Sequence, residues 1–97
     1  MLHLVNKSPY YASSLDSCTK FAKKGAPILL IEDGVYGAMA GTSFESKMAD
    51  IVKDFEVYAL KADLMVRGID KVTAGVKEVD YAGFVELVEQ HNTTTWS

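Results

Sequence analysis

The stretch Ile28-Leu-Leu-Ile-Glu-Asp-Gly-Val-Tyr36 determines the fold class of this chain. Its four consecutive aliphatic residues predict a strand buried on both faces, as in parallel sheets, because a half-exposed strand would alternate apolar and polar residues. The acids Glu32 and Asp33 and the glycine Gly34 follow at the carboxyl end of this strand. In open α/β sheets, ligands and partners bind at that edge.

Asp33 and Gly34 are also expected to begin the next element. We expect Asp33 to cap a short helix predicted over residues 35–40, and Gly34 to permit the tight turn before it. Because Glu32 and Asp33 are adjacent, their side chains would point to opposite faces of an extended strand. These two acids therefore do not predict a paired carboxylate site for catalysis.

Short strands and helices alternate along the rest of the chain. Strands are predicted over residues 2–5, 28–31, 55–60, 76–79 and 93–96. Helices are predicted from the Ser13 cap to Gly25, over residues 35–40, 42–53 and 62–67, and from the Asp80 cap onward. This alternation implies right-handed crossovers and a parallel sheet covered on both faces. We predict a single domain over residues 1–97, a flavodoxin-like three-layer α/β/α fold with a mainly parallel sheet of about five strands.

The first and last helices each have an apolar face at helical spacing. In the first helix the face expected to be buried consists of Leu15, Cys18, Phe21 and Ala22. In the last helix it consists of Tyr81, Phe84, Val85 and Val88.

Composition excludes several classes of protein. Of the 97 residues, 48% are hydrophobic and 24% are charged, which is ordinary for a globular domain and argues against disorder. The net charge of -3 disfavours direct nucleic-acid binding, which needs concentrated lysine and arginine. No signal peptide is expected, and no apolar segment approaches the roughly 20 residues that span a bilayer. The single cysteine excludes an internal disulfide and is typical of the reducing cytoplasm.

No cofactor or metal is predicted. Gly34, Gly37 and Gly41 do not form a G-x-G-x-x-G motif, and the chain has no Walker sequence for binding nucleotide phosphates. It also has no CxxC motif and no cluster of cysteine and histidine at metal-ligand spacing.

Cys18 is the only soft nucleophile in the chain. A reactive cysteine needs a stabilised thiolate and access to solvent, but Cys18 falls inside a helix on the stripe shared with Leu15. We therefore expect a buried thiol that fills the core. His3 is expected to be an interior histidine with a hydrogen-bond partner, and His91 to lie near the end of the last helix.

The loop tyrosines Tyr10 and Tyr11 are candidates for a subunit contact, because aromatic residues are enriched at such interfaces.

Seven segments, taken in order, resemble the DsrH/TusB family and together cover essentially the whole chain. They are Met1-Leu-His-Leu-Val-Asn-Lys-Ser-Pro9, Leu15-Asp-Ser-Cys18, Leu30-Ile-Glu-Asp-Gly-Val-Tyr-Gly-Ala38, Val57-Tyr-Ala-Leu60, Asp63-Leu-Met-Val-Arg-Gly68, Val79-Asp-Tyr-Ala-Gly-Phe-Val85 and Trp96. No single one of these motifs identifies the family, but the seven segments in this order are specific for it. The resemblance implies a small cytoplasmic bacterial subunit of the DsrEFH/TusBCD sulfur-relay complexes.

The resemblance also implies partners and a sulfur-transfer role. In such complexes this chain is joined by two sister subunits, DsrE/TusD-like and DsrF/TusC-like, with two copies of each chain in a heterohexamer. A persulfide passes from a donor through the complex to a downstream carrier, DsrC/TusE-like. In the TusB branch the sulfur becomes the 2-thio group of the wobble uridine of certain tRNAs. In the DsrH branch a similar complex serves the oxidation of stored sulfur.

Cys18 matches a cysteine often found in the DsrH branch. Three runs together also favour that branch: Val5-Asn-Lys-Ser-Pro9, Glu32-Asp-Gly-Val-Tyr36 and Ala40-Gly-Thr42. The main sulfur-carrying cysteine of these complexes belongs to a sister subunit. The corresponding loops here, residues 6–11, 32–36 and 60–63, contain no cysteine. We therefore predict an accessory, assembly-forming subunit in which Cys18 is at most a secondary persulfide carrier.

Two other functions remain open from the sequence. One is a stand-alone sulfurtransferase that uses Cys18 as its persulfide carrier. The other is a flavodoxin-like module that binds a small ligand, although the chain lacks a loop to hold phosphate.

Overall fold

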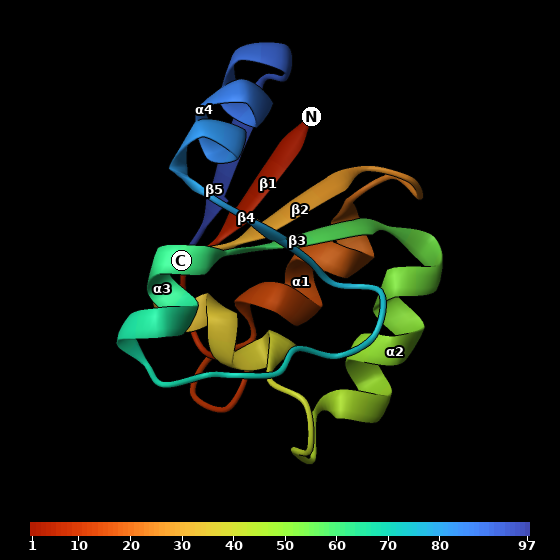
Figure 1. Cartoon of the computed structure of the whole chain (residues 1–97). Helices are drawn as coiled ribbons and strands as arrows, with labels where there is room; N and C mark the ends of the chain where they lie inside the picture. Colours follow the sequence, from red (N-terminus) through yellow and green to blue (C-terminus); the bar gives the residue numbers. More distant parts are fainter.

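Five parallel strands form one sheet in the computed structural model, which describes all residues from Met1 to Ser97 (Figure 1). The strands are β1 (Leu2–Val5), β2 (Pro27–Leu30), β3 (Glu56–Leu60), β4 (Lys77–Val79) and β5 (Thr93–Trp96). Their order in the sheet is β4-β3-β2-β1-β5, and every neighbouring pair is parallel. The predicted α/β fold with five strands is confirmed, and the strand positions agree to within one residue.

The helices lie unequally on the two faces of the sheet (Figure 1). They are α1 (Ser14–Phe21), the 3-10 helix η1 (Glu32–Ala38), α2 (Glu45–Asp54), α3 (Lys61–Val66) and α4 (Tyr81–Gln90). The first four pack on one face, and α4 lies alone on the other. The reason is topological: the early crossovers step from β1 toward β4, whereas α4 crosses back to β5 at the opposite edge. Right-handed crossovers in opposite directions place their helices on opposite faces.

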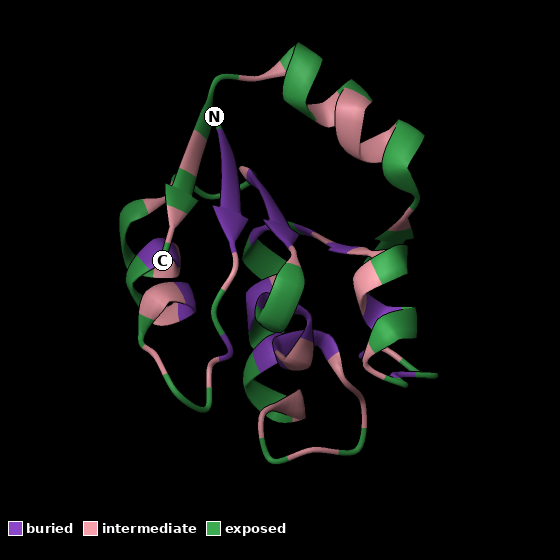
Figure 2. Ribbon diagram, turned by 90° about the vertical axis from the view of Figure 1, so that its left-hand side faces the viewer, coloured by how far each residue is buried: buried purple, intermediate pink, exposed green.

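Strand β2 separates two apolar cores. Ile28 and Leu30 point into the larger core beneath α1, η1, α2 and α3, and Leu29 points into the smaller core beneath α4. All three residues are fully buried, as the unbroken aliphatic run predicts. Figure 2 shows the contrast between the buried strands β1 and β2 and helix α4, which contains no buried residue.

The segment after β2 begins differently from the prediction. The 3-10 helix starts at Glu32 with Ile31 in the cap position, two residues earlier than a helix capped by Asp33 would start, and no side chain caps it. The prediction that Asp33 is the cap is therefore wrong; its carboxylate binds Arg67 instead. Gly34 is required here by a close approach: a Cβ atom at this position would overlap the carbonyl oxygen of Val5.

Two predicted helix faces need correction. Phe21, expected in the core, is 68% exposed because it lies at the last turn of α1, near the sheet edge formed by β5. Tyr81 is 71% exposed and Val88 is also exposed. From α4, the residues that pack on the smaller core are Phe84 and Leu87.

The predicted start of α4 is confirmed, since an Asp80 carboxylate oxygen accepts a hydrogen bond from the Gly83 backbone at 2.8 Å. Gly68 follows the C-cap residue Arg67 of α3 and has the positive φ of 68° that favours glycine at a helix end. None of the helices combines the length and the apolar character needed to cross a membrane.

We expect Gly34→Ala to lower the free energy of unfolding by about 2 kcal/mol or more, because its methyl group must displace the backbone of β1 or η1. Gly37→Ala is the matched control, since a Cβ there meets only side chains, at 3.4 Å or beyond. Urea unfolding measures both variants. Equal stability of the two would show that the approach of Gly34 to Val5 is not a constraint.

Candidate functional site

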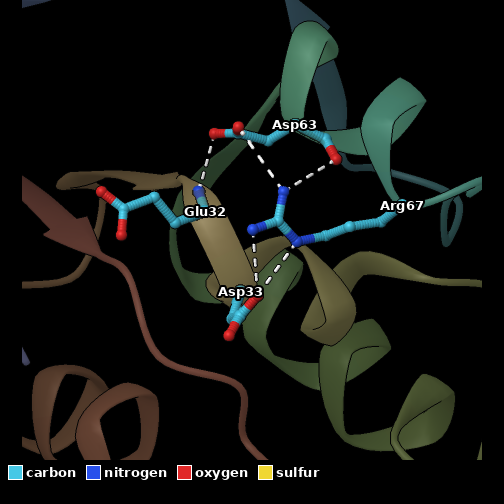
Figure 3. A network of polar contacts seen from close by, with 4 residues as sticks. All are labelled: Glu32, Asp33, Asp63 and Arg67. Atoms are coloured by element: carbon cyan, nitrogen blue, oxygen red, sulfur yellow. Dashed lines mark hydrogen bonds and ion pairs between the residues drawn. The ribbon is translucent and has the colours of Figure 1, made fainter.

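Arg67 joins the carboxyl ends of β2 and β3 through two aspartates (Figure 3). Its Nη2 and Nε atoms lie 2.9 and 3.0 Å from Oδ1 of Asp33. Its Nη1 atom donates to the backbone carbonyl of Asp63 at 3.3 Å and lies 3.6 Å from the Asp63 carboxylate. The Arg67 side chain is only 19% exposed, so these contacts are better shielded from water than ordinary surface ion pairs.

Asp63 also fixes the backbone after β2. Its Oδ2 atom accepts a hydrogen bond of 2.7 Å from the Glu32 backbone N–H, where Glu32 has a positive φ of 49°. The Glu32 side chain points away from the aspartates (Figure 3). Glu32 and Asp33 therefore do not form a paired carboxylate site, as expected from their adjacency, and the edge is held together by Arg67 and Asp63.

Sequence reasoning missed Arg67, which appeared only within a family motif. The available signal was the spacing of Asp63 and Arg67, an acid and a base four residues apart in a predicted helix. The spacing indicates their ion pair, but the contact with Asp33 depends on the fold. No group of three or more cysteine, histidine, aspartate or glutamate residues lies close enough to hold a metal ion.

Cys18 lies in the larger core, in the middle of α1. Its exposed fraction is 0%, and burial raises the pKa of its thiol to about 11. The thiolate, which is the nucleophilic form, is therefore strongly disfavoured near neutral pH. None of the polar contacts that hold the carboxyl edge involves Cys18, so the structure keeps the only thiol apart from the Arg67 contacts.

His3 is buried beside the rings of Trp96 and Phe21. Its Nδ1 atom accepts a hydrogen bond of 3.1 Å from the indole N–H of Trp96, so the imidazole is neutral with its proton on Nε2. Burial, and secondarily the positive charge of the N-terminus, lower the pKa of His3. The predicted interior histidine with a hydrogen-bond partner is confirmed, and His91 is the C-cap of α4.

The tyrosine loop after β1 is open to solvent. Tyr11 is 93% exposed, and Tyr10 packs its ring edge-on against Phe44. Two shallow hollows of about 410 and 450 Å³ are lined by both tyrosines, one with Asp16 and the other with Asp33. The role of these tyrosines in a subunit contact stays a prediction.

Removal of the guanidinium in Arg67→Met leaves two carboxylates without their cation. We expect the free energy of unfolding to fall by about 1–3 kcal/mol, measured by urea unfolding at pH 7. Lys53→Met is the control, because both side chains of its ion pair with Asp50 are more than three-quarters exposed and its loss should cost less than about 0.5 kcal/mol. Similar losses for both variants would contradict the structural role of Arg67.

The lowered pKa of His3 makes stability depend on pH. Between the ordinary value of 6.5 and the lower folded value, the unfolded chain binds more protons than the folded one. Stability is therefore fully present above pH 6.5 and declines as the pH falls below it. In urea unfolding at pH 7.5 and 5.5, His3→Gln should reduce this decline, whereas His91→Gln should retain it. An unchanged decline in His3→Gln would refute the assignment.

Comparison with known proteins identifies the family. The model of the DsrH-like protein family matches residues 7–94. Protein TusB of Photorhabdus laumondii is 36% identical over 98 residues, which cover 99% of this chain and 100% of that protein. Protein TusB of Salmonella arizonae is 37% identical over 100 residues, with 99% and 100% coverage. Protein TusB of Pectobacterium carotovorum is 33% identical over 92 residues, or 94% of each chain.

Two solved structures share the fold. The ychN protein from E. coli superimposes with a TM-score of 0.79 at 17% identity, covering 98% of this chain and 97% of that one. Protein MTH1491 from Methanobacterium thermoautotrophicum has a TM-score of 0.67 at 12% identity, with 97% and 95% coverage. At these identities the likeness concerns the fold alone, and the family follows from the sequence matches: the chain belongs to the DsrH/TusB family of sulfur-relay subunits.

Proposed function

We propose that this chain is an accessory, assembly-forming subunit of a cytoplasmic persulfide-relay complex. Its proposed partners are a DsrE/TusD-like and a DsrF/TusC-like sister subunit, with two copies of each chain in a heterohexamer. The complex passes sulfur to a DsrC/TusE-like carrier. Family membership supports sister-subunit partners in general, and the environment of Cys18 supports the accessory role.

The observation that carries the accessory role is the burial of the only thiol. In persulfide transfer, an acceptor thiolate attacks the outer sulfur of a donor persulfide, and the donor leaves as its own thiolate. The acceptor must therefore be ionised and accessible. Cys18 is fully buried and its pKa is raised to about 11, so it meets neither requirement in this conformation. The same two properties disfavour a stand-alone sulfurtransferase.

Exposed apolar side chains support a function through assembly. Monomeric proteins tolerate scattered apolar residues on the surface, but grouped ones mark sites of contact. Met65 and Val66 are adjacent and both highly exposed at the end of α3, and Tyr10 and Tyr11 are adjacent and exposed in the loop after β1. Buried against sister subunits, these pairs would stabilise the complex relative to the isolated chain.

Coexpression with the two sister subunits tests the proposal. We expect one complex that contains all three chains, and a loss of sulfur transfer to the carrier when this chain is omitted. Mass spectrometry of the carrier measures the transferred sulfur as a mass increase on its acceptor cysteine. In complexes with Cys18→Ala most of this transfer should persist, because the substitution is small and removes no accessible nucleophile.

Two outcomes would contradict the proposal. One is a stable monomer that ignores both sister chains. The other is a fully assembled Cys18→Ala complex that no longer transfers sulfur, since Cys18 would then be an obligatory carrier. The final acceptor is decided separately: loss of 2-thiouridine in tRNA on deletion indicates the TusB role, and loss of oxidation of stored sulfur indicates the DsrH role that the Cys18 match favours.

A further inference from the structure

A cavity of about 500 Å³ opens beside the end of α1, at the amino ends of β1 and β2. It is lined by Met1, His3, Phe21, Ala22, Lys23 and Ala26, and four of these six residues are apolar. Pockets that bind small molecules have this size and this mixture, a mainly apolar wall with a few polar groups that fix the orientation of the ligand. The cavity shares no residue with the Arg67 contacts at the carboxyl ends of the strands.

His3 presents an unpaired hydrogen-bond donor to this cavity. Its Nδ1 atom accepts from the Trp96 indole, so its proton is on Nε2, and Nε2 donates to no group in the chain. The buried polar side-chain atoms that lack a partner are Oδ1 of Asn6 and Oγ1 of Thr73, so Nε2 is open to solvent although only 2% of His3 is exposed. Because His3 lines the cavity and Trp96 does not, the free donor faces the cavity.

A cation lies at the edge of the same cavity. Lys23 is exposed and forms no ion pair within the chain. A free N–H donor and an unpaired ammonium group favour an anionic ligand, because hydrogen bonds to an ionised acceptor are stronger than those to a neutral one. The rest of the wall is apolar, so an anion that fills the cavity must also have an apolar body.

The apolar rim of the cavity supports the same class of ligand. Phe21 and Met1 are both more than half exposed. An apolar group seated between them would remove their surface from water, and this burial favours the bound state.

We propose that this cavity binds a small organic carboxylate with a compact apolar body. The carboxylate accepts the hydrogen bond from Nε2 of His3 and pairs with the ammonium group of Lys23, and the apolar body packs on Phe21 and Met1. Binding at this site needs no sister subunit, so it goes beyond the proposed function and does not depend on it.

Trp96 is a built-in reporter of ligand binding. It is the only tryptophan of the chain, its ring centroid lies 5.5 Å from that of Phe21, and its indole is bonded to His3. We expect phenylpropanoate to change the fluorescence of Trp96 in the full-length chain saturably, with a Kd below about 1 mM. Phenylpropanol and phenylpropylamine keep the apolar body but lack the negative charge, so they should bind about tenfold more weakly or worse.

Two substitutions test the charge and the apolar wall separately. Lys23→Met removes the cation and keeps the length of the side chain, so it should weaken phenylpropanoate about threefold or more and leave phenylpropanol unchanged. Ala26→Leu fills part of the cavity and should weaken both ligands about tenfold or more. Lys20→Met is the matched control, because Lys20 is also on α1 but does not line the cavity.

Proton NMR of the two histidines tests the contact with His3 directly. Addition of phenylpropanoate should shift the imidazole signals of His3. The signals of His91, at the end of α4, should stay unchanged and serve as the internal control.

Three outcomes would overturn the inference: no saturable change in the Trp96 and His3 signals up to about 1 mM ligand, equal affinity for the carboxylate, the alcohol and the amine, or unchanged affinity in a folded Lys23→Met or Ala26→Leu variant. Circular dichroism establishes which variants are folded. If Ala26→Leu does not fold, Lys23→Met still decides between the two results.

The coexpressed complex with the sister subunits separates this inference from the proposed function. Equilibrium dialysis against that complex should give about the same affinity for phenylpropanoate as the isolated chain. Binding by the isolated chain but not by the complex would show that a sister subunit covers the cavity. That result would refute the ligand site and leave the assembly role intact, whereas a chain that binds the ligand but neither sister subunit would refute only the proposed function.

Discussion

Burial of β2 on both faces is the constraint on which the other features depend. Three successive side chains, Ile28, Leu29 and Leu30, point alternately into two cores, so the strand must be covered by helices on each side. The segment that leaves β2 then has to turn sharply beneath the end of β1. Gly34 makes this possible, because only a residue without a Cβ fits against the Val5 carbonyl oxygen. This sharp turn after β2 also brings Asp33 within hydrogen-bond distance of Arg67.

The unequal distribution of helices explains why one face of the sheet covers a much larger apolar core than the other. Four helical elements cover one face and bury a core of 15 residues, which includes Cys18. A thiol in such surroundings loses the hydration that would stabilise its charged form, and nothing cationic replaces it. The most shielded ion pairs of the chain lie instead where η1 and α3 begin, and there Arg67 holds the ends of β2 and β3 together. The fold thus buries its only cysteine in the larger core, and the contacts at the carboxyl ends of β2 and β3 are made by other residues.

The sequence predicted what depends on local pattern. Strand β2 followed from its aliphatic run, and the start of α4 from Asp80, whose side chain caps the helix as expected. The errors concern residues whose surroundings are set by distant parts of the chain. Phe21 has the spacing of a core residue, but the edge position of β5 leaves it exposed. Asp33 resembles a cap, but an arginine 34 residues away takes its carboxylate.

The isolated position of α4 has a consequence for local stability. This helix contains no buried residue, and β5 after it pairs only with β1. Residues from Tyr81 to Ser97 therefore have fewer stabilising contacts than the rest of the chain, and such segments open more readily than the whole protein unfolds. Their amide protons should exchange with solvent while those of β2 stay protected. Such an opening exposes Leu2, Leu4 and Leu29 to solvent. Whether the C-terminal segment stays ordered therefore depends on what packs over that segment.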